Sequence, residues 1–264
     1  MLQGILWALA GTGFTFLMTT IGSAMVFVIR KSAKIDFQKI FLGFAAGVMI
    51  AASIWSLLIP AINEAEAQGK IAWIPAAGGF ILGIVFLLVM DNLLPHFHAG
   101  SREVEGIDTN WKRTTLLFMA VTLHNIPEGM AVGISFALAS QNQDNPALLS
   151  GAIALALGIG IQNLPEGAAI ALPLSQEGMS KKKAFLYGSL SGIVEPIFGV
   201  LVVLVVGKAS PLMPWLLSLA AGAMMYVVVE ELIPEANLGE HSHIGTVSVM
   251  AGFVIMMILD VALG

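Results

Sequence analysis

The chain has 264 residues, of which 57% are hydrophobic and 11% are charged. Because about 25% of the residues in an ordinary soluble domain are charged, this composition excludes a soluble globular protein and indicates one embedded in a lipid bilayer. A formal net charge of −5 without a long basic run excludes a nucleic-acid partner, and the lack of cysteine excludes disulfides and thiolate metal sites.

Eight apolar runs are long enough to cross a bilayer as helices, which takes about 20 residues each. None of them shows the period-two alternation that is typical of the strands of a membrane barrel. In chain order the predicted spans are 4–29, 40–62, 71–94, 114–139, 147–173, 184–207, 211–236 and 243–263. We therefore expect an all-α polytopic membrane protein in which residues 1–264 form a single transmembrane domain.

Basic residues are distributed unevenly among the connections between these spans. The first, third and fifth connections hold ten of the twelve Lys and Arg residues, whereas the second, fourth and sixth hold only Lys70 and Lys208. Connections rich in Lys and Arg stay in the cytoplasm. The odd-numbered connections are therefore predicted to be cytoplasmic, and both termini are predicted to lie outside.

The predicted fourth and fifth spans carry the same polar motif. Residues 124–129 read His-Asn-Ile-Pro-Glu-Gly, and residues 162–167 read Gln-Asn-Leu-Pro-Glu-Gly. The two spans cross the bilayer in opposite directions, so the motifs form an internal repeat of inverted topology. Transporters with such repeats bind their substrate near the midplane of the membrane.

Side chains from four predicted helices fall at one depth. They lie 10 to 15 positions from the nearest cytoplasmic basic residue, which places them near the middle of the bilayer at about 1.5 Å per residue. The four are Met49, His124, Glu166 and Glu195. Met49 has an alternative role as a packing residue of the apolar core. The nearby Asn and Gln side chains have an alternative role in hydrogen bonding between helices.

Three carboxylates at this depth call for a compensating charge, because each costs about 3 kcal/mol or more at the centre of a bilayer. Imidazole and carboxylate ligands suit a borderline divalent transition metal, zinc above all, better than magnesium or calcium. One predicted site consists of His124, Glu128, Gln162 and Glu166. A second and weaker site consists of Asn125, Asn163 and Glu195, with Glu128 and Glu166 bridging the two ions.

The paired motifs resemble those of the ZIP (Zrt/Irt-like) metal transporters, in particular their bacterial GufA-like branch. The resemblance covers all eight predicted spans. It implies uptake of zinc, and in some members of iron, manganese or cadmium, through the bacterial inner membrane into the cytoplasm. It also implies extracellular termini and a homodimer. The metal ion is the transported substrate of such a protein, and no cofactor is implied.

The resemblance further implies a two-metal transport centre. By motif, His124, Glu128, Gln162 and Glu166 belong to the first site together with Met49, and the remaining ligands Asn125, Asn163 and Glu195 belong to the second. Some relatives have an aspartate where this chain has Asn163, which leaves open whether one or two ions bind here.

An inverted repeat of spans 1–3 against spans 6–8, placed around the fourth and fifth spans, is also implied. It is only faintly visible in the sequence. Residues 45–47 and 58–60 read Ala-Ala-Gly and Leu-Ile-Pro, and so do residues 220–222 and 232–234.

Polar residues near the ends of the spans are candidates for an entrance and an exit. Asn63 and Glu64 can attract cations at the outer end of the second span, although a solvated helix end is the alternative. On the inner side, the resemblance implies an exit route along Glu231, Glu230, Asp91 and His96. Without it, these residues are ordinary interfacial charges.

Two functions compete for a membrane-embedded metal site. A transporter needs ligands that bind and release the ion, whereas an intramembrane metalloenzyme needs an open coordination position and a general base. The chain has no His-Glu-x-x-His sequence, and one histidine is predicted at mid-membrane. We therefore expect a transporter that works by alternating access, not an enzyme.

Overall fold

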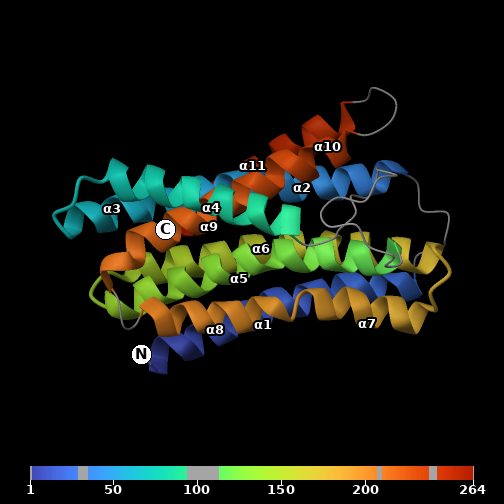
Figure 1. Ribbon diagram of the computed structural model, residues 1–264, viewed down its shortest axis with the longest axis horizontal. Helices are drawn as coiled ribbons and strands as arrows, with labels where there is room; N and C mark the ends of the chain where they lie inside the picture. Colours follow the sequence, from blue (N-terminus) through green and yellow to red (C-terminus); the bar gives the residue numbers. More distant parts are fainter. Residues whose placement is uncertain (1, 29–34, 94–112, 207–209, 238–242, 264) are drawn as a thin grey trace.

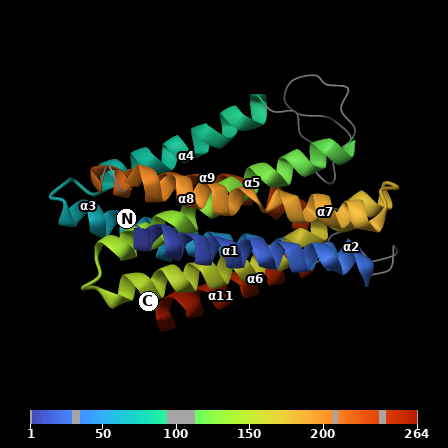
Figure 2. The same ribbon diagram turned by 90° about the horizontal axis from the view of Figure 1, so that it is seen from below.

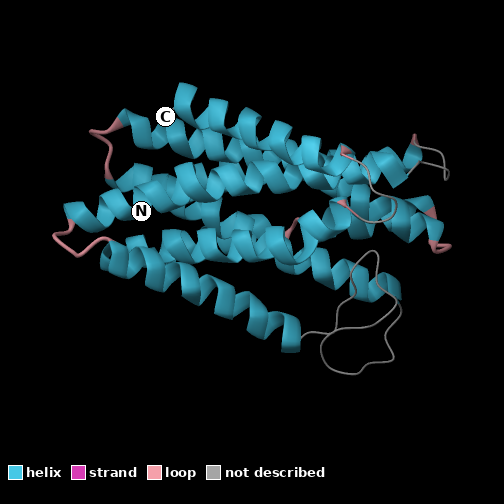
Figure 3. Ribbon diagram, turned by 90° about the horizontal axis from the view of Figure 1, so that it is seen from above, coloured by secondary structure: helices cyan, strands magenta, loops and turns pink. Residues whose placement is uncertain are grey.

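The structure is a computed structural model that describes residues 2–28, 35–93, 113–206, 210–237 and 243–263. Within these residues the chain consists of helices joined by turns, without a strand (Figures 1 and 3). The predicted all-α class is therefore confirmed for this part of the chain. The predicted exit residue His96 lies outside it.

Helices occur at every predicted span, with ends that differ from the prediction by a few residues. The elements are α1 (Leu2–Ala24), η1 (Met25–Phe27), α2 (Ile35–Ala52), η2 (Ser53–Leu58), α3 (Ile59–Ala67), α4 (Trp73–Leu93), α5 (Arg113–Gln141), α6 (Pro146–Gln176), α7 (Lys181–Ser191), α8 (Val194–Val206), η3 (Ser210–Leu212), α9 (Met213–Val227), η4 (Val228–Leu232), α10 (Ile233–Ala236) and α11 (Ile244–Leu263).

Seven helical stretches among the described residues are long and apolar enough to cross a membrane. They are α1–η1, α2–η2–α3, α4, α6, α7–α8, α9–η4–α10 and α11. Helix α5 has 29 residues but is not one of the seven.

Prolines interrupt three of the predicted spans. The second and seventh contain the π-helical turns η2 and η4, each followed closely by a proline, Pro60 or Pro234. The sixth is broken between α7 and α8, two residues before Pro196. A proline has no N–H to donate to the carbonyl four positions earlier, so one hydrogen bond of the regular helix is lost at each of these positions.

Both ends of the described chain lie at the same end of the molecule, which we call the terminal end (Figures 1 and 2). There Gln143, in the connection between α5 and α6, donates a hydrogen bond of 2.8 Å to Gln3. At the opposite end, Lys181 at the start of α7 donates to the carbonyl of Phe27, over 3.3 Å. The helices therefore run alternately between two ends, as the spans were predicted to do.

The helices form two groups. The motif bundle consists of α1, α5, α6, α7 and α8, in which α1 packs on α6 and α5 packs on α8. The flanking bundle consists of α2–α4 with η2 and α9–α11 with η4, in which α2 packs on α11 and α4 packs on α9. Glycines allow close approach within each group, because a Cβ atom on Gly167 would collide with the Thr19 carbonyl and one on Gly47 with the Val249 carbonyl.

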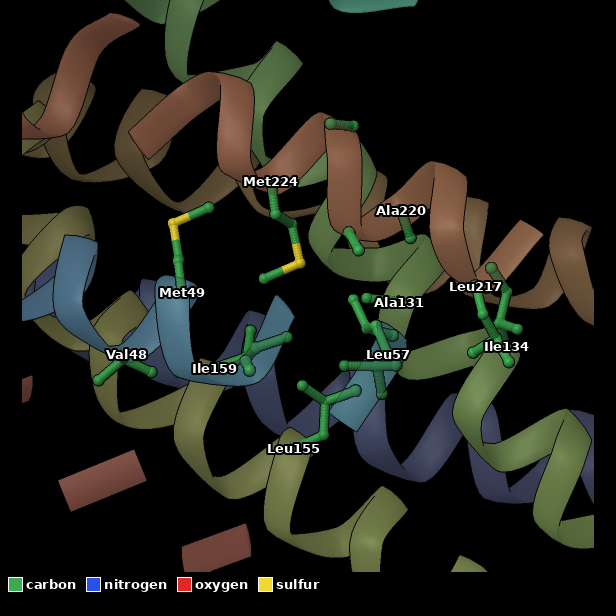
Figure 4. Packing of buried hydrophobic residues seen from close by; sticks show 14 of the residues in the cluster. Val48, Met49, Leu57, Ala131, Ile134, Leu155, Ile159, Leu217, Ala220 and Met224 are labelled. Carbon is green, nitrogen blue, oxygen red and sulfur yellow. The ribbon is translucent and has the colours of Figure 1, made fainter. Parts of the chain in front are cut away.

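The middle of the seam between the two bundles is apolar. Helices α2 and α9 face α6 and α5 across it, and the side chains that fill it are fully buried (Figure 4). They include Leu57, Ile134, Leu155, Ile159, Leu217 and Ala220. The predicted metal ligands of α5 and α6 lie beside this layer, on the side away from the terminal end.

Candidate metal centre

The two motif helices are joined at their predicted ligands. Helices α5 and α6 pack against each other, and Gln162 Nε2 donates a hydrogen bond of 2.7 Å to Glu128 Oε1. Both side chains are buried, with Glu128 only 1% exposed. The structure therefore brings together the first residue of one motif and the fifth residue of the other, which the sequence assigned to a single site.

Glu195 is held on the other side of α6 by donors from two helices. Asn163 Nδ2 donates to its Oε2 over 3.0 Å, and Thr19 Oγ1 donates to its Oε1 over 3.3 Å. Glu195 lies in the first turn of α8, directly after the break that precedes Pro196. The break thus places this carboxylate at a helix N-terminus, where negative charge is favoured.

Asn125 is directed toward the same break. Its Nδ2 donates a hydrogen bond of 3.0 Å to the carbonyl of Ser191, the last residue of α7. This carbonyl belongs to the end of a helix and has no partner in a regular ladder. The amide nitrogen of Asn125 therefore stabilises the broken helix, while its amide oxygen is the atom that can bind a metal.

Three buried oxygen atoms of the predicted ligands have no hydrogen-bond partner among the described residues. They are Glu128 Oε2, Gln162 Oε1 and Asn163 Oδ1. A buried acceptor without a partner costs about 1–3 kcal/mol, and such atoms are rare in folded proteins. Their gathering on two neighbouring helix turns is what a site for a cation requires.

His124 makes the contact that leads away from this layer. Its Nε2 is hydrogen-bonded to Glu231 Oε1 of η4, so the contact crosses the seam from the motif bundle to the flanking bundle. Glu166 lies within electrostatic reach of both residues. His124 and Glu231 keep exposed side-chain fractions of 12% and 8%. A metal can bind His124 Nε2 only when it displaces Glu231 from this nitrogen.

Among the described residues, no three His, Asp or Glu side chains are close enough together to hold a metal ion in this conformation. His124 pairs with Glu231, whereas Glu128 and Glu195 are bonded to amides and a hydroxyl. The amide oxygens are therefore essential to the predicted donor set. Assembly of a full site needs these side chains to rearrange.

Met49 is buried in the apolar layer of α2. Met224 of α9 extends into the same space from the other side, which the sequence analysis did not predict (Figure 4). Because a thioether is a soft ligand and also a good core residue, this position fits both roles that were considered for Met49.

The hydroxyl of Thr19, which donates to Glu195, was also missed. Thr12, Thr15, Thr19 and Ser23 are all buried on one face of α1. Their spacing of three and four positions is the signal that could have revealed a polar face turned toward another helix.

At the terminal end, a cavity of about 390 Å³ lies between the two bundles. Its polar lining includes Ser56, the predicted entrance residue Asn63, Ser135, Asn145 and Asp260. Asp260 was not predicted, although an aspartate near the end of an apolar span was a usable signal. Its Oδ1 accepts a hydrogen bond of 2.5 Å from Ser56, and its Oδ2 has no partner among the described residues.

The remaining predicted entrance and exit residues lie at the two ends of the molecule. Glu64 accepts a hydrogen bond of 2.8 Å from Gln68 and does not line the cavity. At the opposite end, Asp91 lies close to Tyr226 and within electrostatic reach of His124, and Glu230 is exposed. The structure thus gathers Asp91 and Glu231 near His124.

Comparison with known proteins agrees with the two motifs. The profile of the ZIP zinc transporter family matches residues 110–260, more than half of the chain. The chain is 36% identical to zinc transporter ZIP11 of Homo sapiens over the whole of both chains. It is 38% identical to zinc transporter GufA of Myxococcus xanthus over 97% of this chain and 96% of the relative. Zinc transporter ZIPB of Bordetella bronchiseptica is likewise 38% identical, over 98% of this chain and 82% of the relative. These relatives are named as transporters and not as enzymes, and the chain belongs to the ZIP zinc transporter family.

Proposed function

We propose that this protein carries zinc, or a related divalent ion such as iron, manganese or cadmium, across the bacterial inner membrane into the cytoplasm. The observation that carries the proposal is the bonded pair Glu128–Gln162, whose second oxygens are buried without a partner. The names of the relatives favour zinc. The ion is the substrate, the protein is not an enzyme, and it works as a homodimer within the lipid bilayer.

The proposed domain is a single bundle of eight spans, with α5 as the eighth. A polar helix such as α5 can cross a bilayer when its polar face is turned toward other helices, and α5 packs against α1, α6, α8 and α9. The proposed orientation puts the terminal end outside the cell.

The proposed inverted repeat is supported by the packing of the helices. A two-fold axis in the membrane plane would exchange α5 with α6, α1 with α8, α2 with α9 and α4 with α11. Under this exchange the contact of α1 with α6 becomes that of α8 with α5, and the contact of α2 with α11 becomes that of α9 with α4. All four contacts are extensive in the structure.

The proposed first site consists of His124, Glu128, Gln162 and Glu166, together with Met49. The second consists of Asn125, Asn163 and Glu195, with Glu128 and Glu166 as bridges. The buried unpartnered oxygens belong to both sets. This supports a common layer of ligands and does not by itself fix the number of ions.

We infer that the ion moves by alternating access of the two bundles. The apolar seam separates the cavity at the terminal end from the ligands, because Ile134, Leu155 and Leu217 are fully buried between them. On the opposite side, His124 and Glu231 retain slight exposure. The described conformation is therefore closed toward the terminal end, and a displacement of the motif bundle against the flanking bundle would open it.

Uptake of radioactive zinc into proteoliposomes tests the proposal. We expect Glu128→Ala and Glu166→Ala to abolish uptake, because each removes a buried ligand. Asp144→Ala is the matched control, since Asp144 is an exposed carboxylate in the connection between α5 and α6. Uptake by the Glu128 and Glu166 variants at the rate of the control would refute the site, and lack of zinc uptake by the unaltered protein would refute the function.

A further inference from the structure

Two π-helical turns occupy corresponding positions in the flanking bundle. The turn η2 (Ser53–Leu58) lies between α2 and α3, and the turn η4 (Val228–Leu232) lies between α9 and α10. Both end at the repeated Leu-Ile-Pro sequence. We propose that Pro60 and Pro234 are positioning residues of the transport cycle, each of which holds a π-helical turn that directs one polar side chain at one end of the ion pathway. This inference rests on the proposed transport of a divalent ion.

Each π-helical turn lies just before one of the two prolines. Pro60 and Pro234 have no N–H for the carbonyls four positions earlier, those of Ser56 and Glu230. The residue before each proline bonds one position further back instead, Ile59 to the carbonyl of Ile54 and Ile233 to that of Val228. In a bilayer the backbone must find its partners within the protein, and these bonds give a partner to one carbonyl of each turn, that of Ile54 or Val228.

A π-helical turn changes the direction in which its side chains point. It holds an additional residue, and one residue corresponds to a rotation of about 100° around a helix axis. Ser56 lies in η2 and Glu231 lies in η4. If the helix were uninterrupted, the part before the turn and the part after it would be rotated relative to each other. Neither Ser56 nor Glu231 could then keep its present direction relative to both parts.

Each of these side chains makes a polar contact on a different side of the ligand layer. Ser56 Oγ donates to Asp260 Oδ1 over 2.5 Å, in the lining of the cavity at the terminal end. Glu231 is bonded to His124, on the side of the opposite end. We call these two pairs the gate contacts. Single π-helical turns are often found at functional sites, and here each turn supplies one member of a gate contact.

The native chain has no cysteine, so the gate contacts can be measured by cross-linking. Two double variants, Ser56→Cys with Asp260→Cys and His124→Cys with Glu231→Cys, are treated with a short bifunctional thiol reagent in detergent. Both pairs lose their polar groups, so the yield reports only the direction of the backbone. Each pair is then combined with Pro60→Ala, with Pro234→Ala or with the control Pro214→Ala, which replaces a first-turn proline of α9 that no π-helical turn precedes.

We expect Pro234→Ala to remove most of the cross-linked product of the 124–231 pair and to leave the 56–260 pair unchanged. Pro60→Ala is expected to do the converse, and Pro214→Ala to change neither. Deletion of Val229 is a second test, because this residue of η4 is 61% exposed and its loss removes the additional residue of the turn directly. Unchanged yields, or equal losses in both pairs, would overturn the inference.

Zinc uptake by the single proline variants completes the test. Both Pro60→Ala and Pro234→Ala are expected to take up zinc more slowly than the control. Selective loss of cross-linking with unchanged uptake would overturn the role of the turns in transport. Lack of zinc uptake by the unaltered protein would refute the proposed function instead, while the cross-linking yields would still decide whether the prolines direct these side chains.

Discussion

Replacing Glu128 with glutamine separates the binding of metal from the packing of the helices. The new side chain has nearly the same shape, and its amide oxygen can accept the hydrogen bond of 2.7 Å from Gln162 Nε2. It has no charge, so it neither repels the carboxylates of Glu166 and Glu195, which lie within electrostatic reach, nor neutralises a dication. We therefore expect Glu128→Gln to stabilise the metal-free protein and to abolish its response to zinc.

The magnitude follows from two opposing effects. A carboxylate at the centre of a bilayer costs about 3 kcal/mol, and Glu128 is buried near that depth. The hydrogen bond from Gln162 weakens by about 1 kcal/mol, because its acceptor is no longer charged. The variant should thus gain at most about 2 kcal/mol of stability, the full amount only where Glu128 is ionised in the metal-free protein. The unaltered protein should gain about 2.7 kcal/mol when zinc is present at 100 times its Kd, and the variant should gain none of this.

Thermal unfolding in detergent micelles, with a chelator and with zinc, measures both effects. Glu66→Gln is the matched control, because it makes the same chemical change at an exposed position of α3. It should alter neither the unfolding temperature nor the response to zinc. A Glu128→Gln protein that unfolds at a lower temperature in chelator, or that keeps the full stabilisation by zinc, would refute this reasoning.

Three further outcomes follow from the same contacts. Glu231→Gln should bind zinc up to about tenfold more tightly and release it more slowly, because a neutral amide competes less well for His124. Calorimetric titration measures the affinity, and uptake rates measure the release. Gly47→Ala should destabilise the protein by about 1–3 kcal/mol, because the new Cβ atom collides with α11, whereas Gly151→Ala adds a Cβ atom in open space and should not. Thermal unfolding measures both variants, and equal stabilities would contradict the proposed packing. Asp260→Asn should slow uptake at low zinc concentration and leave the maximal rate unchanged, because its charge concentrates cations in the cavity.

The course of the chain through the bilayer was largely predictable. Runs of about 20 apolar residues leave few alternatives to a helix, and the ends of α4 and α11 lie within two residues of the predicted spans. The pairing of Glu128 with Gln162 was also predictable, since two motifs of the same pattern on antiparallel helices meet near their middle. Both predictions depend on local pattern and depth alone.

Contacts between distant segments were not predictable in the same way. His124 and Glu231 are 107 positions apart, and their contact depends on the direction that η4 gives to Glu231. A π-helical turn has the same apolar composition as the α-helix around it, so the sequence showed only a repeated Leu-Ile-Pro. Asp260 was overlooked because a single carboxylate near the end of a span resembles an interfacial charge until the cavity around it is known.

The position of His124 links the occupancy of the centre to the seam between the bundles. Its Nε2 belongs to the predicted first site, yet in this conformation it is bonded to Glu231 of the flanking bundle. In the proposed cycle an ion that takes this nitrogen weakens a contact across the seam, because one nitrogen cannot hold a metal and a hydrogen bond at the same time. The bound ion thereby disfavours the conformation that is closed toward the terminal end, and the return of Glu231 to His124 displaces the ion from this nitrogen and favours its release. Binding and movement are then coupled through one side chain, without any need for a contact between the ion and the apolar layer.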